Sequence, residues 1–347
     1  MTDDRTDAVW FDNEHPALRR CWHPVARAAE LDGDGPLAVE LLGERWCVVR
    51  LDGRLTALRD ACPHRMAPLS AGTIVDGTLQ CSYHGYRFAA DGACVEIPAL
   101  GPDVPIPGKA RCGAAAAVAE HLGLVWIAPE TPIAELPDVP EHADDSFVKC
   151  PLPVSTWNAS AAQMTDNFLD LGHLAFLHLA TFGDAGDRQI GDYEVERDGL
   201  CFSVRYRHLA KALADSFEAG DEFRTVERES WFVYTPPHHV YLRLTYPDEK
   251  AVLSISFCHQ PVDAVTTRLF CTDYRNDIDD EPDAIADAVA FQEAVAAEDR
   301  ALLERLRRKA VPLDPTIEFH SKADRITLEM RRILRELVSL SAAGAPR

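Results

Sequence analysis

Two short motifs, each supplying one cysteine and one histidine, constrain this chain more than any other feature. They are Cys62-x-His64 and Cys81-x-x-His84. Two thiolates and two imidazoles fit an iron–sulfur cluster in which cysteine holds one iron and histidine the other. The same residues fit a tetrahedral zinc site, although zinc sites usually take paired cysteines from one tight turn. Because each arm here supplies one residue of each type, the pattern favours the cluster and one-electron transfer over zinc.

The residues around both motifs resemble the Rieske domains of the Rieske non-haem iron oxygenases. The resemblance rests on Trp22-His23-Pro24-Val25 and His84-Gly85-Tyr86-Arg87-Phe88. Ser82 and Tyr86 depart from the family pattern, where proline and tryptophan are frequent, but neither residue is a ligand. The resemblance implies that Cys62, His64, Cys81 and His84 bind a Rieske [2Fe–2S] cluster.

A Rieske module does not account for the whole chain. A ferredoxin would leave more than half of the 347 residues unexplained, so we expect at least one further domain. A respiratory subunit carries an extra cysteine near each arm, whereas Cys47 and Cys94 lie well outside both motifs. The rest of the sequence must therefore be searched for a second function.

A second motif, Asn167-x-x-Asp170-x-x-His173-x4-His178, lies in an apolar stretch and resembles the mononuclear iron motif of the same oxygenases. Two imidazoles and one carboxylate on one side of a ferrous ion leave positions open for oxygen and substrate. A spacing of five separates His173 and His178 around an ideal helix, so we expect the helix to bulge, kink or end between them. A core helix with two hydrogen-bonded histidines is the alternative.

Asp299 is our candidate for the carboxylate ligand. Residues 283–308 are rich in helix-forming residues and contain no glycine or proline, which predicts one long helix. Asp299 falls within its apolar stripe and Glu298 near the edge. An unpaired buried carboxylate costs several kcal/mol, and iron would be its partner. There are two alternatives: Asp299 pairs with a buried arginine, or the helix turns its other face toward the core. In the family that the chain resembles, the carboxylate ligand lies in a similar Glu-Asp-Arg sequence on a late helix. The stripe is Phe291, Val295, Leu302, Leu303 and Leu306.

The resemblance gives Asp170 and Asn167 separate roles in catalysis. In the family the matching aspartate links a Rieske histidine of one subunit, here His64 or His84, to an iron-binding histidine of its neighbour, here His173. This implies a head-to-tail homotrimer. A carboxylate behind a metal-bound imidazole also fixes the orientation of the ring. Asn167 is either a distant iron ligand or a structural hydrogen-bonding residue.

The order of the expected elements predicts an α+β protein in two parts. We expect an all-β Rieske domain over residues 18–128, a proline-containing linker over 129–140 and a catalytic domain over 141–347. Strands framed by helices indicate the α+β class, and the resemblance specifies a helix-grip fold. Expected strands are 37–42 and 45–51, joined at Gly43-Glu44, with a turn at Asp52-Gly53, then 200–209, 223–234, 239–246 and 251–259; a last helix is expected at 323–339.

Composition limits the partners and the location. A formal net charge of −21 argues against nucleic acid, and no run of eighteen apolar residues suggests a membrane span. The segment Met1–Arg5 lacks a signal-peptide pattern, so we expect a cytoplasmic protein with mostly reduced cysteines. The sequence has no G-x-G-x-x-G fingerprint, so a separate ferredoxin or NAD(P)H-dependent flavin reductase must deliver electrons.

The resemblance implies a terminal oxygenase component, an oxidoreductase that incorporates oxygen from O2. The chain resembles the shorter members without a second subunit type, such as vanillate and dicamba O-demethylases. We therefore expect a monooxygenase or an O- or N-demethylase for a small aromatic or heterocyclic substrate. Ring cis-dihydroxylation, hydroxylation of a natural product and electron transfer without catalysis are the alternatives. His259 and Trp231 are candidate substrate contacts, with a role in the core or at the surface as the alternative.

Overall fold

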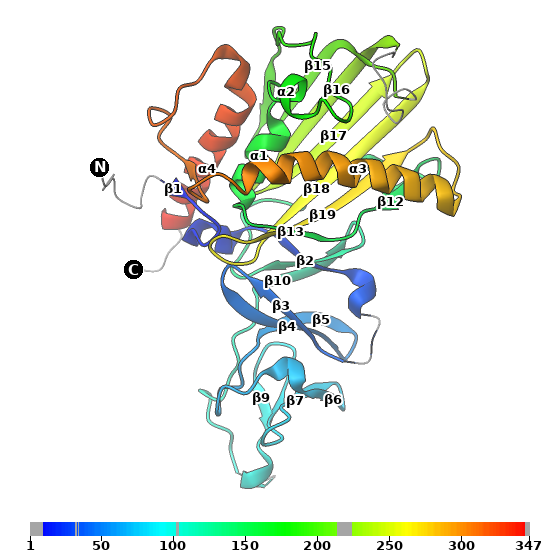
Figure 1. The fold of residues 1–347 in the computed structure, drawn as a ribbon. Helices are drawn as coiled ribbons and strands as arrows, with labels where there is room; N and C mark the ends of the chain where they lie inside the picture. Colours follow the sequence, from blue (N-terminus) through cyan, green and yellow to red (C-terminus); the bar gives the residue numbers. More distant parts are fainter. Residues whose placement is uncertain (1–9, 32, 34, 102–103, 214–223, 344–347) are drawn as a thin grey trace. The chain divides into compact units, whose positions relative to one another are not determined.

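The computed structural model describes residues 10–31, 33, 35–101, 104–213 and 224–343 (Figure 1). The chain forms two compact units. The N-terminal unit comprises Pro16–Glu135 and Gln260–Asp263, and the C-terminal unit comprises Met1–His15, Leu136–His259 and Ala264–Arg347. The segment Met1–Arg5, in which we looked for a signal peptide, lies outside the described residues.

Two short segments do not belong to the unit that their position in the sequence suggests. The chain passes from the first unit to the second after Glu135, inside the linker expected at 129–140. Strand β1 (Trp10–Phe11) belongs to the C-terminal unit, where it pairs with β20 (Val311–Pro312). Residues 260–263 belong to the N-terminal unit, and backbone hydrogen bonds join them to residues 42 and 43. Such assignments depend on hydrogen bonds between residues far apart in the sequence, which a local pattern does not reveal.

The described residues of the N-terminal unit form three small antiparallel sheets. Their strand orders are β10-β11-β2, β3-β4-β5 and β6-β7-β8-β9. The strands are β2 (His23–Arg27), β3 (Leu37–Leu41), β4 (Glu44–Leu51), β5 (Arg54–Arg59), β6 (Thr73–Val75), β7 (Thr78–Gln80), β8 (Arg87–Phe88), β9 (Cys94–Glu96), β10 (Ala117–His121) and β11 (Leu124–Ala128).

Two-residue turns with positive φ connect β3 to β4 and β4 to β5. Leu42 and Gly43 have φ of 54° and 71°, and Asp52 and Gly53 have φ of 49° and 74°. Such turns match the twist of a hairpin. The first turn lies one residue earlier than the expected Gly43-Glu44, because Glu44 already pairs with Leu41 in the ladder.

The C-terminal unit is built on a single large sheet. Eight described strands form it, in the order β12-β19-β18-β17-β16-β15-β14, with β13 also paired to β19. The sheet and its helices confirm the predicted α+β class. The strands are β12 (Val148–Pro151), β13 (Ser155–Trp157), β14 (Val195–Asp198), β15 (Cys201–Lys211), β16 (Thr225–Thr235), β17 (His239–Tyr246), β18 (Ala251–Pro261) and β19 (Thr267–Arg275). The four strands expected between residues 200 and 259 correspond to β15 to β18; Phe223, the expected start of one, lies outside the described residues.

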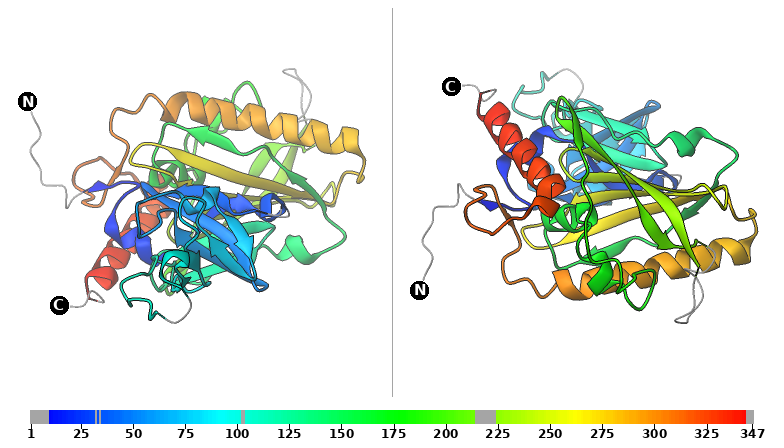
Figure 2. Two further views of the ribbon diagram at one scale, coloured as in Figure 1. Left: turned by 90° about the horizontal axis from the view of Figure 1, so that it is seen from below. Right: turned by 90° about the horizontal axis from the view of Figure 1, so that it is seen from above.

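In the described part of the chain, four α-helices accompany this sheet: α1 (Ala161–Leu169), α2 (Leu174–Leu177), α3 (Pro282–Leu303) and α4 (Arg325–Ala343). Helix α3 lies across one face of the large sheet (Figure 1). The view from above also shows α3 beside that face (Figure 2). No helix in the described ranges has the length and apolar character needed to cross a bilayer.

The long helix differs from the expected one at its C-terminal end. Helix α3 ends at Leu303, and both Leu302 and Leu306 are exposed, so the expected stripe was wrong there. The reason is geometric: the buried face follows every third or fourth residue up to Leu303, which turns Leu302 about 100° away. Leu306 lies beyond the helix. The buried residues of α3 are Ala288, Gln292, Val295, Asp299 and Leu303.

The start of α1 is held by two sets of hydrogen bonds. Ser160 and Gln163 form a capping box, in which each side chain accepts a hydrogen bond from the other residue's backbone N–H. The buried Asn13 accepts a hydrogen bond from the Ala161 N–H, at 2.7 Å, through its Oδ1. Its Nδ2 donates to the Thr266 carbonyl and to Thr267 Oγ1, both at 3.0 Å. One amide therefore fixes the N-terminus of α1 to the start of β19.

Replacing Asn13 with alanine should destabilise the C-terminal unit. The change leaves three polar groups, two of them buried, without this partner, so we expect the free energy of unfolding to fall by about 2–4 kcal/mol. Urea unfolding followed by tryptophan fluorescence measures the change. Asn158→Ala is the control, because that side chain is exposed, and it should stay within about 0.5 kcal/mol of the parent protein. Equal effects of the two substitutions would contradict this role for Asn13.

Candidate metal centres

The four residues of the cysteine and histidine motifs lie on two neighbouring loops of the N-terminal unit. Cys62 and His64 follow β5, while Cys81 and His84 lie between β7 and β8. Both cysteines are buried, at 2% exposure each, whereas both histidines are exposed. The two imidazole rings lie 4.5 Å apart between centroids. The loops thus place two sulfur donors inside and two nitrogen donors at the surface, which fits a two-iron cluster with cysteine on the inner iron.

Each loop turns back on its own cysteine. The Cys62 carbonyl accepts a hydrogen bond from the Met66 N–H at 2.8 Å, and the Cys81 carbonyl accepts one from the Gly85 N–H at 3.1 Å. Gly85 has a φ of 71°, a conformation that glycine adopts without strain. The residue after it, Tyr86, stacks on the His64 ring with centroids 4.6 Å apart. Tyr86, one of the two positions at which the sequence departs from the family pattern, therefore covers one of the imidazoles.

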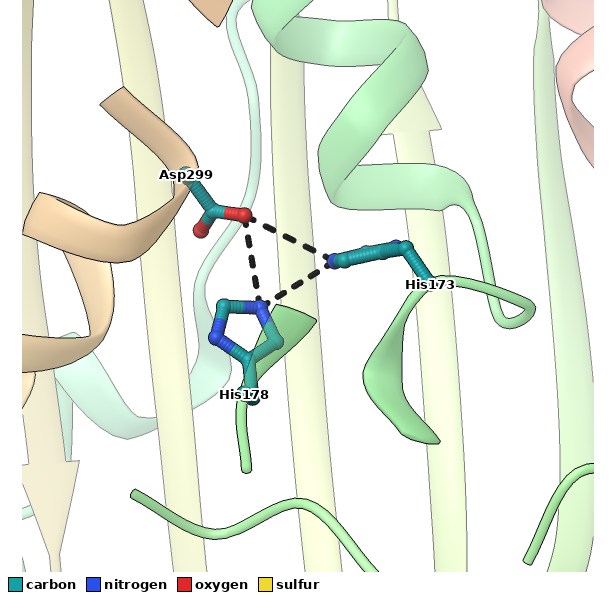
Figure 3. A group of neighbouring side chains, drawn as sticks. All are labelled: His173, His178 and Asp299. Carbon is teal, nitrogen blue, oxygen red and sulfur yellow. Dashed lines mark hydrogen bonds and ion pairs between the residues drawn. The ribbon is translucent and has the colours of Figure 1, made fainter. Parts of the chain in front are cut away.

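Three further donors meet in the C-terminal unit. His173 and His178 lie at the two ends of the one-turn helix α2, and Asp299 projects from α3 (Figure 3). Their donor atoms point toward one another. The two Nε2 atoms are 3.2 Å apart, and Asp299 Oδ1 lies 3.6 Å from that of His173 and 3.3 Å from that of His178.

The chain is not one continuous helix across this motif. Helix α1 ends at Leu169, and Asp170 has an extended backbone with ψ of 133°. Helix α2 then begins after His173 and ends before His178. The two imidazoles reach a common point because the helical turn between them starts and stops within the motif.

The hydrogen bonds behind the two imidazoles decide which nitrogen carries the proton. His173 Nδ1 lies 3.0 Å from Asp170 Oδ2, and His178 Nδ1 lies 2.8 Å from Glu298 Oε2. A carboxylate accepts a hydrogen bond, so each Nδ1 carries the hydrogen and each Nε2 presents a lone pair. Two lone pairs and the Asp299 carboxylate facing one point repel one another unless a cation lies between them.

The spacing of the three donor atoms fits a single metal ion. Ligand atoms about 2.1 Å from a metal, at angles of 90–109°, lie about 3.0–3.4 Å from one another. Two of the observed separations, 3.2 and 3.3 Å, lie in this range, and the third, 3.6 Å between His173 and Asp299, lies just above it. Two histidines and one carboxylate on one side of a metal are the ligand set of ferrous oxygenases. The residues therefore fit the iron that the sequence motif predicts.

Hydrogen bonds hold these donors in place. Asn167 Nδ2 donates to Asp299 Oδ1 at 2.8 Å, so Asn167 lies against the carboxylate. Asp170 also accepts hydrogen bonds from the backbone N–H groups of Gly172 and His173, both at 3.0 Å. Burial by itself would raise the pKa of Asp170, but the hydrogen bond from the His173 side chain and those from the backbone lower it below its usual value. Asp170 is therefore a carboxylate that orients the His173 ring.

Glu298 is a site residue that the sequence reasoning did not assign. Its Oε2 accepts hydrogen bonds from the His178 ring and from Thr181 Oγ1, the latter at 2.7 Å. One residue before Asp299 on a helix, it points about 100° away and so reaches the far side of the same imidazole. The sequence signal that could have identified Glu298 was its position directly before the candidate metal ligand Asp299.

An apolar pocket lies beside the three donors. Alternate residues of β16, β17 and β18 form one wall, because alternate side chains of a strand share a face. Residues of α1, α2 and α3 form the other. The lining residues include Phe168, Phe232, Leu242, Leu244, Ile255, Phe257, Phe291, Gln292, Val295, His173, His178 and Asp299.

The two candidate substrate contacts do not line this pocket. His259 is fully buried; burial lowers its pKa to about 4, and its Nδ1 donates to the His238 carbonyl at 2.5 Å. It stacks behind the pocket residue Phe168, with ring centroids 5.4 Å apart. Trp231 alternates with Ser230 and Phe232 and thus faces the other side of the sheet, where Arg205 stacks on it at 4.2 Å. The strand pattern did not reveal which face turns toward the pocket, because both faces of β16 mix polar and aromatic residues.

Comparisons with known proteins agree with both centres. The Rieske [2Fe-2S] domain model matches residues 21–118, and the vanillate O-demethylase oxygenase C-terminal domain model matches residues 157–340. Methylxanthine N1-demethylase NdmA of Pseudomonas putida is 30% identical over 96% of this chain and 93% of its own length. Methylxanthine N3-demethylase NdmB of the same organism is 30% identical over 94% of this chain and 90% of its own.

Solved structures show the same architecture. The structure of Pseudomonas putida NdmA with caffeine matches with a TM-score of 0.82 and 29% identity, over 96% of this chain and 94% of that one. Dicamba monooxygenase bound to dicamba, at 24% identity, shares the fold with a TM-score of 0.77 over 94% and 99% of the two chains. The match to the catalytic domain covers more than half of the sequence, and the relatives align along nearly its whole length. The chain therefore belongs to the Rieske non-haem iron oxygenases of the vanillate O-demethylase type, oxidoreductases with a Rieske [2Fe–2S] cluster and a mononuclear iron.

Proposed function

We propose that this terminal oxygenase hydroxylates a small aromatic or heterocyclic molecule, most readily at an O- or N-methyl carbon. The observation that carries the proposal is the apolar pocket lined by His173, His178 and Asp299. From Phe291 to Asp299 the pocket follows α3 for about 12 Å, the length of a molecule with one or two rings. A hydroxylated O- or N-methyl group breaks down with release of formaldehyde, so a pocket of this kind can serve a demethylase.

The residues of the chain have distinct tasks in this function. Cys62, His64, Cys81 and His84 would hold the Rieske cluster, and His173, His178 and Asp299 would hold the iron. When bound, the cluster passes single electrons and the iron activates O2. The apolar walls exclude water and press the substrate against the open side of the iron ligands. Asp170 and Glu298 keep the two imidazoles aimed at one point, and Asn167 does the same for Asp299.

We further propose that electrons cross between subunits of a head-to-tail homotrimer. The Asp170 side chain is 30% exposed while it holds His173, so it retains an edge that a neighbouring subunit can approach. His64 and His84 are exposed on the N-terminal unit. One of them would donate a hydrogen bond to Asp170 of the next subunit, giving a path from cluster to iron.

One relative, TsaM2 of Comamonas testosteroni, is named as an iron-sulfur subunit of a monooxygenase system, which supports a separate ferredoxin or flavin reductase as donor.

We also propose a cytoplasmic location. All ten cysteines lie in described segments, and no disulfide bond joins any two of them. Ten cysteines without a disulfide suit a reducing compartment.

The proposed function predicts a defined loss of iron in a ligand variant. Anaerobically prepared protein should contain about three irons and two acid-labile sulfides per chain, and Asp299→Ala should lose one iron and keep the reduced Rieske EPR signal. His121→Ala, which lies outside both sites, is the control. A panel of aryl methyl ethers and N-methyl heterocycles, supplied with a reductase, should release formaldehyde with the parent protein and none with Asp299→Ala. A cis-diol with both oxygen atoms from O2 would instead establish ring dihydroxylation.

A pair of inactive variants should restore activity when their subunits are mixed. His178→Ala lacks the iron site and Cys81→Ala lacks the cluster, so each is inactive alone. If electrons cross between subunits, co-expressed mixed trimers regain about a quarter of the parent turnover, and at most about a third, because a mixed ring of three has one junction from a cluster-bearing to an iron-bearing subunit. Adding Asp170→Asn to the iron-bearing subunit should abolish the recovery. Failure of the mixed oligomers to turn over would contradict the path.

Replacing Glu298 should weaken iron binding, whereas replacing an exposed glutamate of the same helix should not. Without the carboxylate, the His178 ring loses the hydrogen bond that fixes its proton and its orientation, so Glu298→Ala should weaken iron binding about 10- to 100-fold. Titration of iron-free protein with ferrous iron measures this affinity. Glu293→Ala, exposed on the same helix, is the matched control and should bind iron like the parent protein. The same affinity in both variants would show that Glu298 does not position His178.

A further inference from the structure

One charged residue interrupts the apolar wall of the substrate pocket. Arg228, near the start of β16, lines the same pocket as the iron ligands and is only 6% exposed. Its Nη2 and Nε lie 3.0 and 3.3 Å from His208 Nε2, and its Nη1 lies 3.4 Å from the Tyr246 hydroxyl. All of its hydrogen-bond partners in the described part of the chain are therefore uncharged groups.

The partner histidine is neutral. Burial, and then the charge of Arg228, lower the pKa of His208 well below its ordinary value. Its Nδ1 lies 3.2 Å from Asp187 Oδ2, so the ring donates to that carboxylate and accepts from Arg228. Asp187 is 41% exposed and is separated from the guanidinium by the width of the imidazole ring. Its charge is largely screened by water, so it does not neutralise Arg228.

Other buried arginines of this unit are paired directly. Arg275 binds Asp277, with 2.5 Å between Nη2 and Oδ2, and Arg331 binds Asp166, with 2.8 Å between Nη2 and Oδ2. Among the residues that the structure describes, Arg228 makes no such ion pair. A buried cation without an anion is costly, and apolar side chains often replace buried charges without loss of stability. Fold stability therefore gives little reason to have arginine at this point of the wall.

The guanidinium has donors left for a ligand. Of its five N–H groups, two serve His208 and one serves Tyr246, which leaves one on each terminal nitrogen. Two N–H groups on neighbouring nitrogens match the two oxygens of a carboxylate. Ser230, the next residue on the same face of β16, also lines the pocket and adds a hydroxyl beside them.

We propose that the substrate of this oxygenase is an organic acid whose carboxylate pairs with Arg228. The apolar part of the molecule would then lie between Phe232, Ile255 and Val295, with the reacting carbon toward His173, His178 and Asp299. The ion pair would fix which end of the substrate faces the iron ligands, so Arg228 determines both affinity and the site of reaction. This inference rests on the proposed function for the reaction, but the binding step can be measured without turnover.

The test compares acids with their neutral amides. Benzoate and benzamide, and 3- and 4-methoxybenzoate with their amides, are titrated by calorimetry into the parent protein and into Arg228→Met, Arg228→Lys and Arg207→Met. Arg207 is the matched control, because it lies next to His208 on β15 and pairs with Glu229 outside the pocket. The parent protein and Arg207→Met should bind each acid at least about tenfold more tightly than its amide. Arg228→Met should lose that preference, and Arg228→Lys should keep part of it.

Thermal unfolding separates a binding role from a structural one. Arg228→Met should unfold at the parent temperature or higher, since the variant removes an unpaired buried charge. A clearly lower temperature together with an unchanged acid preference would make Arg228 a structural residue and overturn the proposal. So would amides that bind as tightly as acids, or acids that show no saturable binding up to about 10 mM. Acids that bind through Arg228 without yielding formaldehyde or a hydroxylated product would contradict the proposed function and leave the carboxylate site established.

Discussion

The metal site of the C-terminal unit depends on one constraint: the fold holds three donor atoms close together although they repel one another. The Nε2 atoms of His173 and His178 and a carboxylate oxygen of Asp299 lie within 3.2 to 3.6 Å of one another. Asp170 and Glu298 accept hydrogen bonds from the Nδ1–H groups, so both Nε2 lone pairs face the Asp299 carboxylate when the rings are neutral. A cation can relieve this repulsion, and the free energy of its binding offsets the cost of the arrangement. The broken helix between Leu169 and His178, the capped start of α1 and the length of α3 all serve to keep this geometry.

The pocket next to the donors joins two kinds of environment. Its walls of leucine, isoleucine, valine and phenylalanine remove water from the reacting end, while Arg228 and Ser230 provide a polar end. An aromatic acid has the same division, with an apolar ring and a charged group. The single ion pair with Arg228 would set the direction of such a substrate in the pocket.

The N-terminal unit divides its ligands between interior and surface. Cys62 and Cys81 are surrounded by the small apolar core of that unit, which includes Leu58, Leu79 and Phe88. Thiolates in such surroundings are shielded from oxidants and from exchange. His64 and His84 lie at the surface, where another protein or subunit can approach within hydrogen-bond distance. An electron can thus leave through an imidazole without exposing the sulfur side of the cluster.

The sequence by itself determined the α+β class and most of the elements, because these depend on short spacings and on hydrophobic periodicity. The spacing of Cys62, His64, Cys81 and His84 favoured a cluster, and a carboxylate on the buried face of a helix made Asp299 the candidate ligand. The tertiary structure alone decided what lies between distant residues. It placed Glu298 behind His178, turned Trp231 away from the pocket, put His259 behind Phe168 and brought Arg228 into the wall. These outcomes depend on which face of β16 turns inward and on how α3 crosses the sheet. A strand with polar and aromatic residues on both faces does not encode that choice locally, since it is made by packing against side chains far away in the sequence.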